Sequence, residues 1–189
     1  MLRIILARHG RIVWDFATAI PGRAFAAWLE GENHAPIDPS HRPPAELQHL
    51  VRAADGVVAS PLRRSLESAS LLAPTAPPLI DACFREAELP SAVGSGLRLR
   101  ADIWAGLART AWFCGWSPGV ESFKAARGRA ARAAGILAAQ AGARGPIALV
   151  GHGLMNILIA AQLRRAGWSG PLLPPQRHWG FAVYERVAA

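Results

Sequence analysis

The chain opens with LRIILARHG, residues 2–10, and this stretch guides the interpretation of the rest. Its first part, Leu2–Ala7, is apolar at nearly every position, as in a strand that helices cover on both faces. The run then stops at Arg8 and His9, and Gly10 follows with the freedom to turn the backbone. Two basic side chains therefore stand at the carboxyl end of a buried strand.

Other short runs predict further strands, at Gly56–Ser60, Leu79–Phe84 and Pro146–Gly151, and the alternating WGFAVYERV of residues 179–187 predicts a last strand at an edge. Helical patterns lie between them, at Pro44–Ala54, Leu62–Leu72, Ser122–Ala141 and Leu154–Ala166. Strands that alternate with helices predict an α/β fold with a mainly parallel sheet.

Two segments interrupt the alternation. Residues 17–43 are rich in proline, and we expect them to be irregular. Residues 87–118 contain a Trp-rich helix candidate, Leu99–Phe113, which we interpret as part of a cap beside the sheet. We therefore expect one domain over 1–189, with a cap-like insertion at roughly 87–118. The tryptophans at 104, 112 and 116 could line a substrate pocket, but packing is favoured.

The composition fits a globular protein and narrows the classes of partner that we expect it to bind. Apolar residues make up 51% of the 189 residues, which is enough for a substantial core. The net charge of +8 is attributed to coding bias and solvated helix faces rather than to nucleic-acid binding. Cys83 and Cys114 are isolated, which favours a reducing compartment. With no leader-like start and no membrane-length apolar run, we expect a cytoplasmic protein without membrane contact.

Charged or titratable side chains follow each of the first four predicted strands. Arg8 and His9 end the first strand, Arg63 and Arg64 follow the second, Arg85 and Glu86 follow the third, and His152 ends the fourth. Carboxyl ends of parallel strands lie at one edge of a sheet, where open α/β folds bind ligands. A cluster of cations loses solvation unless an anion completes it, and arginine matches phosphate oxygens well. The helices after Ser60 and His152 add their positive ends, so a phosphate site is predicted.

Two histidines in such a site indicate chemistry as well as binding. An imidazole can attack phosphorus and carry the phosphoryl group covalently. The leaving oxygen then needs a proton, and a carboxyl group can deliver it. Glu86 is the best placed carboxylate because it follows the third strand.

Four motifs resemble the histidine phosphatase superfamily, also called the phosphoglycerate-mutase-like family: LARHG (6–10), ASPLRRSLESA (59–69), FRE (84–86) and VGHG (150–153). The resemblance covers most of the chain, with the motifs in the family's order. It implies a three-layer α/β/α sandwich with a mostly parallel mixed sheet and a small helical cap. It also implies a phosphatase of the histidine acid type that needs no metal and no organic cofactor.

The resemblance assigns roles to individual residues. His9 is the nucleophile that becomes phosphohistidine, His152 is the second histidine, and Glu86 is the proton donor. Arg8 and Arg64 bind the phosphoryl group. Arg63 matches less well, because adjacent helix residues point about 100° apart and only one of the two arginines can face the site.

The chain departs from the family pattern at several positions. Arg11 and Ile12 replace the pair that often follows the RHG motif. Asp15 occupies a position where a phosphate-contacting asparagine is common, so we place Asp15 in the candidate phosphate site. Its charge would repel phosphate unless it pairs with an arginine, turns outward or holds a proton. Glu88 is a second candidate for the acid.

The predicted function is hydrolysis of a small phosphomonoester, or of a phosphoramidate such as protein phosphohistidine. A phosphoglycerate-mutase-type transfer, a non-catalytic phospho-ligand module and a nucleic-acid-binding protein are the alternatives. A metal at His34, Asp38 and His41 is disfavoured because the spacing is loose. His49 and His178 are interpreted as ordinary surface or packed residues. The substrate and the oligomeric state stay open, with a homodimer as one option.

Overall fold

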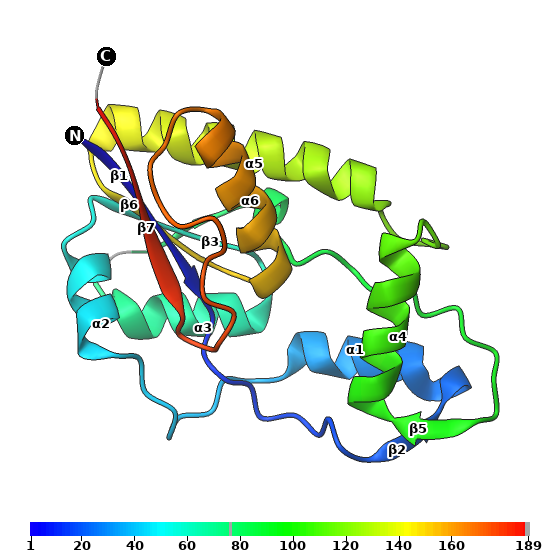
Figure 1. The fold of residues 1–189 in the computed structure, drawn as a ribbon. Coiled ribbons are helices and arrows are strands. Elements are labelled where there is room, and N and C mark those ends of the chain that lie inside the picture. The colour runs from blue at the N-terminus through cyan, green and yellow to red at the C-terminus, as the bar shows by residue number, and fades with distance from the viewer. Residues whose placement is uncertain (76, 188–189) are drawn as a thin grey trace.

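The computed structural model describes residues 1–75 and 77–187. Its centre is a five-stranded sheet in the order β4-β3-β6-β1-β7 (Figure 1). The strands are β1 Leu2–Arg8, β3 Gly56–Ala59, β4 Leu79–Ile80, β6 Ile147–Gly151 and β7 Phe181–Arg186. All pair in parallel except β7, which runs antiparallel to β1 at the edge. The mostly parallel mixed sheet and the terminal edge strand are both confirmed.

Helices cover both faces of this sheet (Figure 1). Helices α2 Ala45–Arg52 and α3 Arg63–Leu72 lie on one face, and α5 Phe123–Arg144 and α6 Gly153–Arg165 lie on the other. Successive side chains of β1 point to opposite faces: Ile4 and Leu6 pack with α5 and α6, whereas Ile5 and Ala7 pack with α2 and α3. This alternation explains why the strand is apolar along its length, and the predicted three-layer sandwich is confirmed.

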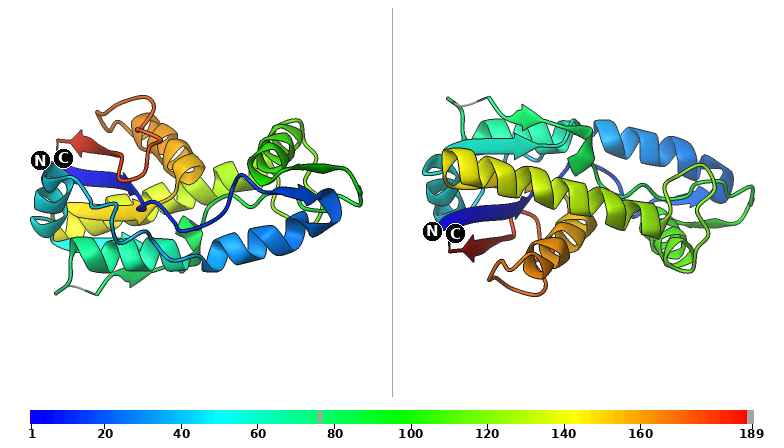
Figure 2. Two further views of the ribbon diagram at one scale, coloured as in Figure 1. Left: turned by 90° about the horizontal axis from the view of Figure 1, so that it is seen from below. Right: turned by 90° about the horizontal axis from the view of Figure 1, so that it is seen from above.

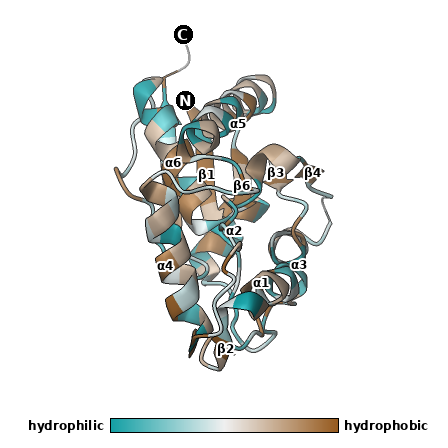
Figure 3. Ribbon diagram, turned by 90° about the vertical axis from the view of Figure 1, so that its right-hand side faces the viewer, coloured by the Kyte–Doolittle hydropathy of each residue, from teal (hydrophilic) through white to brown (hydrophobic). Residues whose placement is uncertain are grey.

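A second group of elements lies at the end of the molecule opposite the termini (Figure 2). It contains the two-stranded sheet of β2 Ala19–Pro21 and β5 Arg98–Arg100, the 3-10 turn η1 Gly22–Ala24, and helices α1 Phe25–His34 and α4 Ala101–Phe113. Phe25, Trp104 and Ala108 form its own small core. Figure 3 shows hydrophilic and hydrophobic residues alternating along α1 and α4, as expected for helices with one packed side.

Two expectations about local structure were wrong. Residues 17–43 are not irregular throughout, because they hold β2 and the helix α1. The third strand is also shorter than the predicted Leu79–Phe84. It stops at Ile80, since the Asp81 side chain accepts a hydrogen bond from the Cys83 backbone N–H at 2.7 Å and starts the 3-10 turn η2 Ala82–Phe84. A short polar side chain that bonds its own backbone ends a strand in this way.

The tryptophans behave as packing residues where they are buried. Trp104 is 7% exposed and Trp112 is fully buried, whereas Trp116 lies at the surface.

Among the described residues, no helix combines the length and the apolar character that a membrane crossing requires.

Candidate active site

Neighbouring parallel strands bring the two motif histidines together. Arg8 of β1 stands in register with Gly151 of β6, and the His9 backbone N–H donates to the Gly151 carbonyl at 3.0 Å. The rings of His9 and His152 have their centroids 5.2 Å apart. Both residues are buried. The convergence expected from the sheet topology is therefore present at the carboxyl edge.

The hydrogen-bond partner of His9 determines which ring nitrogen carries the proton. Its Nδ1 lies 2.7 Å from the Gly10 carbonyl oxygen. Because a carbonyl only accepts, Nδ1 must carry the hydrogen, and Nε2 then holds a free lone pair. Burial, and next the charge of Arg64, lower the pKa of His9 well below its ordinary value of 6.5. His9 is thus neutral at physiological pH, which is the state that a nucleophile requires.

The contact with Ser60 determines which ring nitrogen of His152 carries the proton. Ser60 Oγ lies 2.6 Å from His152 Nε2 and also accepts a hydrogen bond from the Leu62 N–H at 3.3 Å. Among the described residues the hydroxyl hydrogen has no acceptor other than Nε2, so the hydroxyl donates to Nε2 and Nδ1 carries the ring proton. That Nδ1 is buried and has no hydrogen-bond partner among the described residues. It is an N–H donor that lacks an acceptor in the described part of the chain.

Two guanidinium groups flank the histidines. Arg64 is only 4% exposed and Arg8 is half-buried, and the Nε atom of each is buried without a partner among the described residues. Desolvation lowers the pKa of both. Arg63, by contrast, is exposed and pairs with Glu67 at 2.6 Å. Of the two adjacent arginines, Arg64 is thus the one at the site.

Arg8, His9 and Arg64 line one cavity of about 650 Å³, and His152 lies behind His9. The polar lining residues also include Glu86, and the apolar ones are Phe16, Trp28, Leu29, Leu89, Ala105 and Val120. Such a volume is that of a small-molecule site. The cavity thus combines cationic groups suited to an anion with apolar side chains suited to the body of a ligand.

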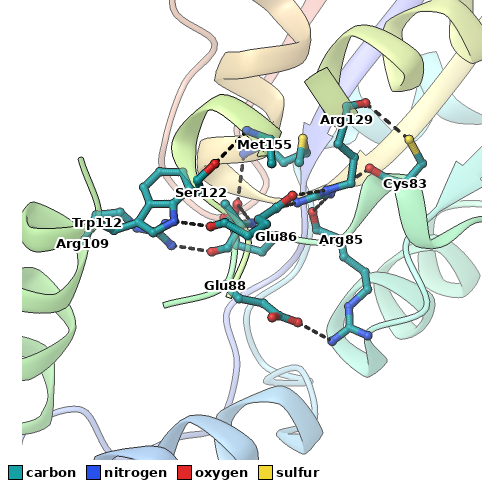
Figure 4. Close-up of polar contacts among 12 residues, drawn as sticks. Cys83, Arg85, Glu86, Glu88, Arg109, Trp112, Ser122, Arg129 and Met155 are labelled. Carbon is teal, nitrogen blue, oxygen red and sulfur yellow. Dashed lines mark hydrogen bonds and ion pairs between the residues drawn. The ribbon is translucent and has the colours of Figure 1, made fainter. Parts of the chain in front are cut away.

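The start of α6 holds the Glu86 carboxylate (Figure 4). It accepts hydrogen bonds from the backbone N–H groups of Leu154 at 3.2 Å and Met155 at 3.0 Å. Glu88 also lines the cavity, but it is directed to Arg85 at 3.4 Å and its side chain is 52% exposed (Figure 4). The fixed position of Glu86 at the start of α6 makes it the better candidate for proton transfer.

Asp15 does not join this group. Its carboxylate accepts hydrogen bonds from the Ala17 and Thr18 backbone N–H groups and from the Thr18 hydroxyl. These bonds lower its pKa, so it is a charged group. It lines a separate surface pocket rather than the cavity of His9. The outward orientation removes the repulsion of phosphate, and we assign Asp15 no phosphate contact.

The segment with His34, Asp38 and His41 is held by other contacts. Asp38 accepts from the Ser40 backbone at 2.9 Å and pairs with Arg11 at 3.6 Å. In the part of the chain that the structure describes, no three side chains of the histidine, cysteine or carboxylate type are grouped as metal ligands.

Four cavity residues had no signal in the sequence: Glu32 and Asn33 of α1, Arg109 of α4, and His178. Glu32 approaches Arg64 at 4.0 Å, and burial raises the pKa of its carboxyl group. Asn33 accepts a hydrogen bond from Arg64 at 3.3 Å. Arg109 donates to the Ala87 carbonyl at 2.6 Å and keeps a buried Nη1 without a partner among the described residues (Figure 4). No motif marks these positions, because they come from the segments outside the sheet.

Gly10 is required by close packing. A methyl group at this position would overlap the indole ring of Trp179. The Gly10 backbone N–H also donates to Ser68 Oγ at 2.9 Å, and that hydroxyl donates to the Arg64 carbonyl at 2.6 Å. Gly10 therefore couples the nucleophile loop to the helix that carries Arg64.

Comparison with known proteins places this geometry in a family. Residues 4–179 match the model of the histidine phosphatase superfamily, branch 1. None of the curated proteins matches the chain.

Several solved structures share the fold. A Mycobacterium tuberculosis open-reading-frame product is 16% identical with a TM-score of 0.59, over 96% of this chain and 89% of its own. A mycobacterial glucosyl-3-phosphoglycerate phosphatase is 23% identical with a TM-score of 0.56, over 87% and 83%. A phosphoserine phosphatase of Entamoeba histolytica is 16% identical with a TM-score of 0.58, over 87% and 81%. The family match covers most of the chain, three of the four motifs contribute residues to one cavity, and His152 of the fourth lies against His9. This chain belongs to branch 1 of the histidine phosphatase superfamily.

Proposed function

We propose that this protein is a metal-independent phosphatase that hydrolyses a small phosphomonoester through a phosphohistidine on His9. The observation that carries the proposal is the protonation pattern. A neutral His9 with a free Nε2 lies beside two guanidiniums whose Nε atoms are buried, and beside the unpartnered N–H of His152. The site thus combines a nucleophile with several donors that lack an acceptor, which is what a phosphoryl group supplies.

In the first step, His9 Nε2 attacks phosphorus. The N–P bond forms as the bond from phosphorus to the ester oxygen breaks. Glu86 takes up a proton from solvent when the substrate binds and gives it to the departing oxygen. In the second step, water attacks phosphorus, the N–P bond breaks, and Glu86 takes the proton of the water. His9 returns to its neutral state and phosphate is released.

Charge on the equatorial oxygens is stabilised by Arg8, Arg64 and the Nδ1–H of His152. Phosphoryl transfer depends chiefly on positioning and on such stabilisation. In metal-dependent phosphatases the cation is a bound ion. Here the guanidiniums take that role, and the low exposure of Arg64 strengthens its interaction with the anion.

The substrate is a small phosphorylated molecule that fits a cavity of about 650 Å³. Two of the structural neighbours are named phosphatases of small molecules, glucosyl-3-phosphoglycerate phosphatase and phosphoserine phosphatase, which favours hydrolysis over a mutase reaction. A phosphoramidate remains an alternative substrate, because its P–N bond can be attacked in the same way.

The test is phosphate release from a panel of phosphomonoesters, including p-nitrophenyl phosphate, in the presence of chelator. Wild type should turn over and form an acid-labile phosphoenzyme, and His9→Ala should do neither. His49→Gln, at an exposed position of α2, is the matched control and should behave as wild type. Saturable phosphate binding with no turnover by wild type would instead indicate a non-catalytic phospho-ligand module.

A further inference from the structure

A third histidine lies against the nucleophile. The ring centroid of His178 is 5.4 Å from that of His9, and His178 lines the same cavity. It is half-buried, in the loop before β7. We expected an ordinary surface or packed residue at this position, and the structure places it in the site instead.

The backbone around His178 is held in an unfavourable conformation. Trp179 has a φ of 59°, and among the described residues it is the one non-glycine residue with positive φ. An aromatic side chain rarely adopts this region, and such strain persists where the surroundings enforce it. Here the indole is packed under Gly10 and donates from Nε1 to the His41 carbonyl at 2.8 Å. The tryptophan therefore fixes the histidine before it against His9.

The contacts of His178 also determine which of its two ring nitrogens carries the hydrogen and which has a free lone pair. Its Nδ1 lies 3.4 Å from the His9 carbonyl oxygen, and the Trp179 backbone N–H approaches the same oxygen at 3.4 Å. A carbonyl only accepts, so Nδ1 is the protonated nitrogen. The Nε2 lone pair then has no hydrogen-bond partner among the residues that the structure describes.

We propose that His178 is a further phosphate-contacting residue of this site, and that one proton is held between its Nε2 and an oxygen of the bound phosphate. The inference rests on the proposed function, because it needs phosphate beside His9. Without that proton, the Nε2 lone pair would face an oxygen lone pair and repel it. The proton comes from solvent when the phosphate binds as a dianion, and from the ligand when it binds as a monoanion.

The charges around His178 explain why the proton arrives only with phosphate. The groups that face it are Arg8 and His9 at the end of β1, Arg11 in the next loop, and His41 before α2. Burial, and next the charge of Arg8, lower the pKa of His178 to about 4. A phosphate dianion reverses the sign of the local charge and favours the imidazolium. Binding should therefore be accompanied by proton uptake.

The test is calorimetric titration with inorganic phosphate in two buffers of different ionisation enthalpy, which counts protons. At about pH 8 inorganic phosphate is predominantly a dianion, as is a phosphate monoester with its second pKa of about 6. His178 should account for about one proton per bound phosphate, and this proton lowers the affinity of wild type about tenfold per pH unit relative to a variant without it. His178→Asn keeps a donor but cannot titrate, so it should take up about one proton fewer than wild type does; uptake by Glu86, the acid of the proposed reaction, is common to both.

His49→Gln is the control and should take up protons as wild type does, and His178→Gln repeats the test with a longer amide. No uptake by folded wild type, or unchanged uptake by both His178 variants, would overturn the inference. Trapping the phosphoenzyme distinguishes a failure of the His178 inference from a failure of the proposed function. Phosphohistidine formed by wild type without linked proton uptake removes only the role of His178, whereas absence of both phosphohistidine and phosphate binding removes the proposed function as well.

Discussion

Removal of the Ser60 hydroxyl tests whether the second histidine is held in one tautomer. Ser60 and His152 are both fully buried, and Oγ lies 2.6 Å from Nε2. Ser60→Ala would leave Nε2 without this partner. An unsatisfied buried polar atom costs about 1–3 kcal/mol, so the free energy of unfolding should fall by about 2 kcal/mol.

The same substitution should impair turnover. With the hydroxyl gone, nothing described near Nε2 favours the proton on Nδ1, and the tautomer with an acceptor at Nδ1 repels a phosphoryl oxygen. A hydrogen bond to a charged group contributes about 1.5–3 kcal/mol, so a 10- to 100-fold fall in kcat/KM is expected, at about 1.4 kcal/mol per factor of ten.

Chemical denaturation and steady-state kinetics measure the two effects separately. Ser70→Ala, at an exposed position of α3, is the control and should change neither. A Ser60→Ala enzyme with lower stability but wild-type kcat/KM would show that the tautomer of His152 does not matter. A variant unchanged in both respects would refute the hydrogen-bond argument itself.

Three further substitutions or conditions follow from the site. Glu86→Gln should slow hydrolysis of alkyl phosphates about 10²- to 10⁴-fold but p-nitrophenyl phosphate far less, because that leaving group needs no proton, whereas Glu88→Gln should act as wild type in kinetic assays. Gly10→Ala should lower the free energy of unfolding by about 1–3 kcal/mol, measured by thermal melts, because its methyl group overlaps a buried indole. His9 and His152 both have lowered pKa values, so below pH 6.5 the unfolded chain binds more protons. Their stabilisation is complete above that pH and should decrease by about 1.4 kcal/mol per unit for each on acidification; a denaturation midpoint unchanged by acid would contradict this.

The part of the site that lies on the sheet was predictable for a physical reason. The run Leu2–Ala7 is apolar because helices cover both faces of β1, and the chain turns polar where the strand leaves the core. The ends of the buried strands β1, β3 and β6 are therefore visible in the sequence. Since parallel strands end at one edge, the convergence of His9 and His152 with the segment after β3 follows from local patterns. The choice of Arg64 over Arg63 comes from the family resemblance, and Glu86 lies beyond a strand that ends earlier than predicted.

The remaining part was not predictable because it depends on long-range packing. Helix α1 lies between prolines and fully buries only Phe25, so its pattern is weak. Its partners are α4 and the start of α3 rather than the sheet. Glu32 reaches Arg64 only because this packing exists. Likewise, the position of His178 depends on a left-handed tryptophan, which no rule of local sequence anticipates.

The missed residues change what the motif residues can do. Four guanidiniums line the cavity, those of Arg8, Arg64, Arg85 and Arg109, and four carboxyl groups line it too, those of Glu30, Glu32, Glu86 and Glu88. With neutral histidines the opposite charges nearly balance, and protonation of a buried imidazole would add uncompensated charge beside the guanidiniums. A bound phosphate dianion makes the cavity negative, and protonation then becomes favourable. The empty site thus keeps its nucleophile neutral for the same electrostatic reason that makes the loaded site take up a proton. The basic motif residues alone do not predict this difference in protonation between the empty and the loaded site. The difference depends on burial and on carboxyl groups from elsewhere in the chain.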